Sequence, residues 1–123
     1  MTDGLYSERV RTFAQGMPGS VLEYPFGPEA SVYKVGGKMF ALVAVDGSEY
    51  VTLKVEPEEG VALRSEHSFV REGYYMNKRH WITLDLGPDV NMAEVDELIE
   101  NSHRLVVSAL TKKVRTELGL DGS

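Results

Sequence analysis

A long amphipathic segment near the C-terminus most limits the folds that this chain can adopt. Asn91 as N-cap and Glu94 at the third helical position approximate a capping box, which predicts a helix beginning at Met92. Over residues 92–110, the positions of one helical face recur at regular spacing, and all but one are apolar: Val95, Leu98, Ile99, Ser102, Leu105, Val106, Ala109 and Leu110. The sequence therefore predicts a long helix with one face buried against another layer.

Short apolar runs, separated by glycine and proline, precede this helix. Gly36-Gly37 is the two-residue signal of a hairpin. Residues 68–77 are expected to form a loop or an irregular strand, and regular strands are expected over residues 21–24, 31–35, 38–45, 50–55 and 81–86. Their order and short spacing indicate a sheet of about five antiparallel strands with one buried face.

Further helical segments are expected at both ends and in the middle of the chain. Ser7 is a candidate N-cap for a helix over residues 7–17, whose apolar face would hold Val10, Phe13, Ala14 and Met17. A short helix is expected over residues 57–67 and a shorter turn over 111–118. The fold class is therefore α+β.

Composition sets limits on function. At 123 residues the chain is one domain, with a core expected over about residues 7–118. It has no cysteine, which excludes disulfides, thiolate nucleophiles and cysteine-bound metal. The sequence shows no signal-peptide pattern and no run of about 20 apolar residues, so a cytoplasmic protein is expected. The net charge of −6 counts against a surface that is basic all over.

Sequence patterns for catalysis or metal binding are missing. The chain has no P-loop, no dinucleotide-binding glycine pattern and no Gly-x-Ser-x-Gly elbow. His67, His80 and His103 form no pair at metal-binding spacing, and the acidic residues within 89–100 are interpreted as a solvated helix face. We therefore expect a protein that is not an enzyme and that has no cofactor and no metal.

One stretch combines groups suited to binding. Residues 73–86, GYYMNKRHWITLDL, place an amide, two cations and a histidine before the only tryptophan. Lys78 and Arg79 suit phosphate contacts, and Asn77 suits polar recognition. In the alternative interpretation, Asn77 satisfies loop backbone, the cations are simply exposed and Trp81 anchors the core. The aromatic rings available for stacking on a base are those of Tyr74, Tyr75 and Trp81.

Three motifs together resemble one known family. PFGPEASVYKVGGKMFAL (residues 25–42), LKVEPEEGVALR (53–64) and GYYMNKRHW (73–81) occur in this order, before the acidic-then-apolar last helix. Over about residues 7–118 the chain resembles the MmcQ/YjbR family of small bacterial proteins. Its Asn-Lys-x-His-Trp pattern matches Asn77, Lys78, His80 and Trp81, and its Lys-Met-Phe-Ala pattern matches residues 38–41. Tyr75 and His103 depart from the family, in which histidine and tyrosine are common at these positions.

The resemblance implies both a fold and a function. Members are similar in fold to frataxin/CyaY, with helices on one face of an antiparallel sheet, and are described as DNA-binding through a "double wing" of β elements. An iron chaperone is not expected, because the only acid of the first helix, Glu8, is flanked by Arg9 and Arg11. DNA is therefore the expected partner of a monomer or weak dimer, through Lys34, Lys38, Lys54, Asn77, Lys78, Arg79, His80 and Trp81.

A second hypothesis of a different class uses the same motif. Asn77, His80 and Trp81 would line a pocket for a small anionic ligand or for a partner protein. The two hypotheses predict different surfaces. DNA binding needs a basic band that meets several phosphates, whereas a ligand site needs a concave pocket with a few converging polar groups.

Overall fold

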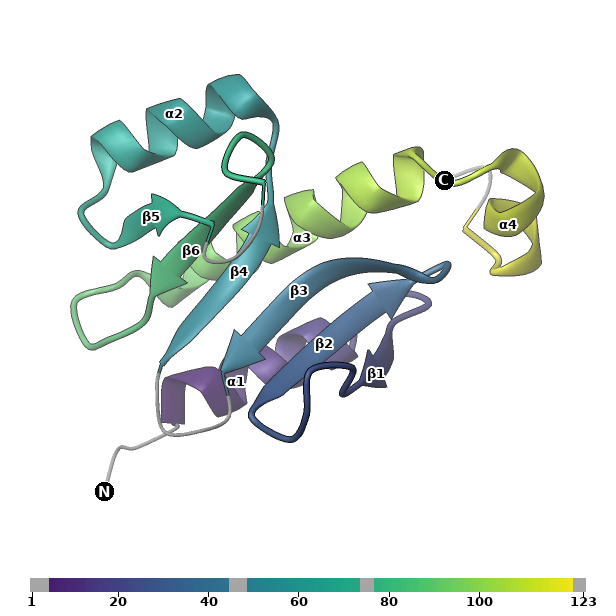
Figure 1. Cartoon of the computed structure of the whole chain (residues 1–123), viewed down its shortest axis with the longest axis horizontal. Coiled ribbons are helices and arrows are strands. Elements are labelled where there is room, and N and C mark those ends of the chain that lie inside the picture. The colour runs from purple at the N-terminus through teal and green to yellow at the C-terminus, as the bar shows by residue number, and fades with distance from the viewer. Residues whose placement is uncertain (1–4, 45–48, 74–76, 121–123) are drawn as a thin grey trace.

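The computed structural model describes residues 5–44, 49–73 and 77–120, and in this part of the chain six strands form one sheet (Figure 1). All neighbouring strands are antiparallel, and their order is β1-β2-β3-β4-β6-β5. The strands are β1 (Val21–Glu23), β2 (Ala30–Val35), β3 (Lys38–Ala44), β4 (Tyr50–Lys54), β5 (Val70–Glu72) and β6 (Trp81–Asp85). The helices are α1 (Leu5–Gln15), α2 (Pro57–Glu66), α3 (Met92–Ser108) and α4 (Lys112–Glu117).

Helices α1 and α3 lie on one side of the sheet, as the family resemblance implies. In Figure 1, α1 and α3 run behind the strands, where α3 packs on β3 and β4 and α1 packs mainly on β3. The strand residues of this core are Tyr33, Val35, Ala41, Val43, Val51, Leu53, Ile82 and Leu84, and the helix residues include Val10, Ala14, Val95, Ile99 and Val106. The opposite side of the sheet, which faces the viewer, carries no helix in the described part of the chain. We call it the open face.

The sixth strand, β5, was expected as a loop or irregular strand. It has only three residues, too few for a pattern of alternating apolar positions to stand out. Val70 pairs with Leu84, and the Gly73 amide donates to the Trp81 carbonyl oxygen at 2.9 Å. Pairing with β6 therefore makes a strand of a segment whose own sequence only weakly indicates one.

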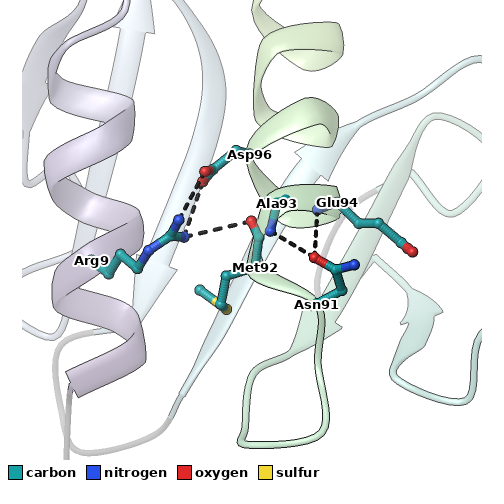
Figure 2. A network of polar contacts seen from close by, with 6 residues as sticks. All are labelled: Arg9, Asn91, Met92, Ala93, Glu94 and Asp96. Carbon is teal, nitrogen blue, oxygen red and sulfur yellow. Dashed lines mark hydrogen bonds and ion pairs between the residues drawn. The ribbon is translucent and has the colours of Figure 1, made fainter.

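The prediction of the long helix is confirmed, including its N-cap. The side-chain oxygen of Asn91 accepts from the backbone amides of Ala93 and Glu94 at 2.9 and 3.4 Å (Figure 2). The Glu94 carboxylate points toward another element, because its Oε2 lies 3.5 Å from His67 Nε2. Figure 2 also shows Arg9 of α1 making two parallel hydrogen bonds to the Asp96 carboxylate, at 3.0 and 3.1 Å, which join α1 to α3.

The predicted cap of the first helix is wrong. The helix begins at Leu5, and Ser7 is a fully buried residue of its first turn. A carboxylate distant in sequence does the capping instead: Glu49 Oε1 accepts from the amides of Tyr6 and Ser7 at 2.8 and 2.9 Å. Such a cap cannot be recognised from local spacing, since the acceptor lies more than forty residues away.

None of the helices in the described segments has the length and apolar character needed to cross a membrane.

Candidate nucleic-acid interface

Three of the predicted binding residues lie on the open face. Side chains alternate between the two sides of a strand. Lys34 lies between the core residues Tyr33 and Val35, so it points away from the core. By the same alternation Lys54 and Trp81 also point to the open face, because their neighbours Leu53, Val55 and Ile82 belong to the core.

The strand register places these residues in two groups at the same end of the sheet, because direct pairing of β3 with β4 ends at Ala41–Leu53 and does not join Met39 to Lys54. Lys54 on β4 is the direct partner of Trp81 on β6, and Lys34 on β2 is the partner of both Val21 on β1 and Met39 on β3. We call Val21, Lys34, Met39, Lys54 and Trp81 the basic row. It contains two cations, three apolar or aromatic residues and no acid. Trp81 is half-buried, and its place opposite the core argues against its role as a core anchor.

Ser102 of α3 joins β3 to β4 between the two groups of the basic row. The sequence analysis placed this residue only on a buried helix face. The Ser102 hydroxyl of α3 accepts from the Lys54 amide at 2.8 Å and donates to the Phe40 carbonyl oxygen at 2.6 Å. Direct pairing of β3 with β4 covers Ala41–Leu53 to Val43–Val51. Beyond Ala41–Leu53 the two strands are joined through Ser102, which bonds the Phe40 carbonyl oxygen and the Lys54 amide. A serine among apolar positions was the only signal for this contact.

A β-bulge in β3 accompanies the Ser102 contact. Tyr33 pairs with Ala41 and Lys34 with Met39, which leaves Phe40 as the extra residue of β3. Phe40 is therefore turned to the helix side, where its ring meets His103 edge-on with centroids 5.1 Å apart. His103 also hydrogen-bonds the Pro18 carbonyl oxygen through Nε2 at 2.7 Å, so this residue is a buried structural histidine.

The turn before Trp81 is ordered by Asn77. Its Oδ1 accepts from the Arg79 amide at 3.0 Å, and its carbonyl oxygen accepts from the His80 amide at 3.1 Å. The His80 carbonyl oxygen in turn accepts from the Val55 amide at 2.8 Å, which fixes the turn to the end of β4. Asn77 thus satisfies loop backbone, as the alternative interpretation holds.

Lys78 and Arg79 border a separate hollow. Both are exposed, and they line a space of about 290 Å³ beside α2. Its other lining residues are Pro57, Glu58, Val61, Arg64 and Glu72. The lining of this hollow does not include Asn77, His80 or Trp81, the residues expected to line a ligand pocket. The two cations therefore belong to the hollow beside α2 and not to the basic row.

Lys38 lies apart from both groups. Its partner across the β2–β3 hairpin is the core residue Val35, so Lys38 is directed away from the open face. The hairpin tip packs against α4 and the segment between α3 and α4: a Cβ atom on Gly36 would come within 2.7 Å of the Leu110 methyl groups and 3.2 Å of Val114. The tip therefore does not project as a free wing.

Four of the charged side chains on the open face form two ion pairs. Lys34 Nζ lies 3.0 Å from Glu23 Oε1, and Arg71 donates to the Asp85 carboxylate from Nε and, at 2.7 Å, from Nη2. Lys54 forms no ion pair with any residue in the described ranges. The described residues also include no cluster of three or more histidine, aspartate or glutamate side chains suited to a metal ion. Tyr74 and Tyr75, proposed as stacking residues, lie outside the described residues.

Comparison with known proteins shows relatives over most of the chain. The sequence model of the YjbR family matches residues 15–105. The uncharacterised Escherichia coli O157:H7 protein YbdF is 36% identical over 107 residues, covering 86% of this chain and 88% of the relative. The uncharacterised protein YjbR of Escherichia coli K12 is 30% identical over 104 residues, covering 84% and 88%.

Solved structures agree in fold. The crystal structure of the Deinococcus radiodurans protein DR2400 has a TM-score of 0.84 and 36% identity, over 94% of this chain and 89% of that one. A Pseudomonas syringae protein has a TM-score of 0.69 and 27% identity, over 80% and 97%. On the match of sequence and fold, with the Asn77–Trp81 motif ordering the turn into β6, this chain belongs to the YjbR family.

Proposed function

We propose that this chain is a DNA-binding protein without an enzymatic activity, and that DNA lies on the open face along the basic row. The observation that supports this most is the direct pairing of Lys54 with Trp81 on a sheet face that no described helix covers. A cation beside a half-buried aromatic ring offers phosphate neutralisation and base contact at one place.

The distribution of acids reconciles this proposal with the net charge of −6. The open face carries Lys34, Lys54 and Arg71 against Glu23 and Asp85, a balance of three minus two, or +1. The helices hold many of the other acids: Glu8, Glu58, Glu59, Glu66, Glu94, Asp96, Glu97 and Glu100. Because exposed charges farther apart than about 8 Å are largely screened at physiological salt, acids across the sheet weaken this surface little.

The binding should be modest and strongly salt-dependent. Lys34 and Lys54 can neutralise about two phosphates. Counterion release then lowers the affinity by about 7- to 12-fold between about 50 and 200 mM salt. Lys34 must exchange its exposed ion pair with Glu23 for a phosphate, which costs little because such surface pairs contribute about 1 kcal/mol or less.

The test is fluorescence anisotropy with a labelled duplex carrying a single-stranded tail, which offers both forms of DNA. We expect a micromolar Kd at about 50 mM salt, and weaker binding with a shallower salt slope for Lys34→Ala/Lys54→Ala. The matched control is Arg104→Ala/Lys112→Ala, which removes two exposed cations from α3 and α4. Absence of binding by the wild type at low salt would refute the proposal, as would equal effects of the two double variants.

A second candidate function rests on the hollow beside α2. Arg64, Lys78 and Arg79 surround it and would attract a small anion, while Glu58 and Glu72 would oppose one. Titration with inorganic phosphate, followed by NMR shifts of the 77–80 turn amides, tests this function. Saturable shifts that are lost in Lys78→Ala/Arg79→Ala, with DNA binding intact, would favour the hollow as the functional site.

A further inference from the structure

We infer that the DNA bound by this chain is single-stranded and crosses the strands along the basic row, with one base stacked on the Trp81 indole. This inference rests on the proposed function and names the form of DNA that the same surface takes. Three observations carry it: the shape of the open face, the surroundings of Trp81 and the spacing of the cations.

The shape of the open face is unsuited to a duplex. Beside the basic row, Thr52 and Thr83 are at most 1% exposed, and their hydroxyls are hydrogen-bonded at 2.9 Å. The centre of the face is therefore filled, without a groove at these two residues. Duplex readers insert a helix or a two-stranded ribbon into the major groove. On this side no described helix is available, and the tip of the β2–β3 hairpin is packed against Leu110.

The surroundings of Trp81 suit a stacked base. Its neighbour on β4 is Lys54, and on β5 the next position is Gly73, whose amide donates to the Trp81 carbonyl oxygen. A Cβ atom on Gly73 would lie 2.6 Å from the Trp81 Cβ, so only glycine fits there. A base can stack on a protein ring only when one of its own faces is free, as in a single strand.

The spacing of the cations suits a short single strand. Adjacent paired strands lie about 4.8 Å apart, so Lys54 begins about 5 Å from Trp81. Lys34 begins more than about 10 Å from Lys54, because Ser102 separates the unpaired ends of β3 and β4 between them. A base on Trp81 therefore places its neighbouring phosphates near Lys54 and, farther along, near Lys34. Val21 and Met39 supply apolar surface between and beyond the cations, and Val21 is 53% exposed.

The acids of the open face confine the DNA to this row. Glu23 and Asp85 both lie outside the basic row, toward the other end of the strands, as the partners of Val32 and Tyr50. A polyanion is repelled there and attracted along the row. The site accommodates about four nucleotides, at the small end of the range for single-strand binding sites on β structures.

The experiment compares a labelled 12-nucleotide oligo-dT with a mixed-sequence 12-base-pair duplex at about 50 mM salt, by anisotropy and by quenching of tryptophan fluorescence. Trp81 is the only tryptophan, so quenching reports contact at this ring. We expect oligo-dT to bind at least tenfold more tightly than the duplex and to quench Trp81. Trp81→Ala should weaken oligo-dT binding by about 5- to 150-fold, the range reported for loss of one stacked base.

A second variant keeps the test valid if Trp81→Ala is unstable. Lys54→Ala leaves the ring in place and should lower the slope of log affinity against log salt by about 0.7 for a single strand. Lys113→Ala on α4 is the charge-matched control. Duplex binding equal to or tighter than oligo-dT binding would overturn the inference but leave the proposed function standing. Oligo-dT binding without quenching, and unaffected by Lys54→Ala, would also overturn it, whereas no binding of either DNA would refute the proposed function itself.

Discussion

Replacing Ser102 with alanine tests how the two halves of the sheet are joined. Ser102 is fully buried, and its hydroxyl is the partner of the Lys54 amide and of the Phe40 carbonyl oxygen. Ser102→Ala removes one oxygen and leaves two backbone groups without this partner. The change adds almost no cavity, so its effect on stability comes from hydrogen bonding.

The expected loss of stability follows from the burial of the two groups. A buried donor or acceptor left without a partner costs about 1–3 kcal/mol. The Phe40 carbonyl oxygen belongs to a fully buried residue, whereas Lys54 is half-exposed and water can reach its surroundings. We therefore expect a total of about 2–3 kcal/mol, most of it from Phe40.

Urea unfolding, followed by Trp81 fluorescence and circular dichroism, measures this loss. With a slope of about 1.5 kcal/mol per molar urea, a loss of 2 kcal/mol lowers the midpoint by about 1.3 M. Amide hydrogen exchange at Lys54 should accelerate, because this amide loses its acceptor. The control is Ser108→Ala on the same helix, since Ser108 is exposed and bonds only its own helix at Leu105. It should change stability by less than about 0.5 kcal/mol.

If Ser102→Ala behaves like the control, the predicted role of the Ser102 hydrogen bonds is refuted. A change below about 0.5 kcal/mol, with unchanged exchange at Lys54, would mean that the bonds through Ser102 contribute no net stability. A change in the unfolding slope instead of the midpoint would indicate a change in compactness, not a lost hydrogen bond.

Two further predictions concern residues away from the open face. Glu49→Ala removes the acceptor of two α1 amides and should lower stability by about 1–2 kcal/mol, whereas Glu49→Gln keeps an oxygen without the charge and should lose less. Urea midpoints of the two variants decide this, and equal midpoints to wild type would contradict the capping role. Burial raises the pKa of Tyr33 above its usual 10.0, with a hydrogen bond to Ser31 opposing the shift in part. Above about pH 10 the unfolded chain loses this proton more readily than the native state, so stability should fall as the pH rises. Tyr33→Phe should flatten the fall in urea midpoint between pH 9 and about 11, and an unchanged fall would refute the assignment.

Local sequence signals predicted the elements that have strong periodicity or turn chemistry. The apolar stripe of α3 follows from the spacing that lets one face of a helix be buried. The Asn91 cap and the Gly36-Gly37 hairpin follow from residue types that favour these positions. The motif 77–81 was recognised as a unit, and the structure places it at the entry to β6. Its residues nevertheless separate, since Trp81 joins the open face while Lys78 and Arg79 border the hollow beside α2.

The contacts missed from the sequence are those between residues far apart in the chain. Glu49 caps α1 across 42 or more positions, and Ser102 bridges Phe40 and Lys54 from 62 and 48 positions away. No local pattern encodes such a pairing, because each partner is an ordinary residue in its own segment. Likewise, β5 is a strand because β6 offers it a hydrogen-bonding edge.

The amino-acid sequence by itself determined the α+β class, the order of the main elements and the membership of the YjbR family, because periodicity and motifs are properties of neighbouring residues. The tertiary structure alone decided which of the predicted binding residues share a surface. Alternation counted from the core residue Ala41 would put Lys38 on the open face, but the β-bulge at Phe40 shifts the register and turns Lys38 to the other side of the sheet from Lys34.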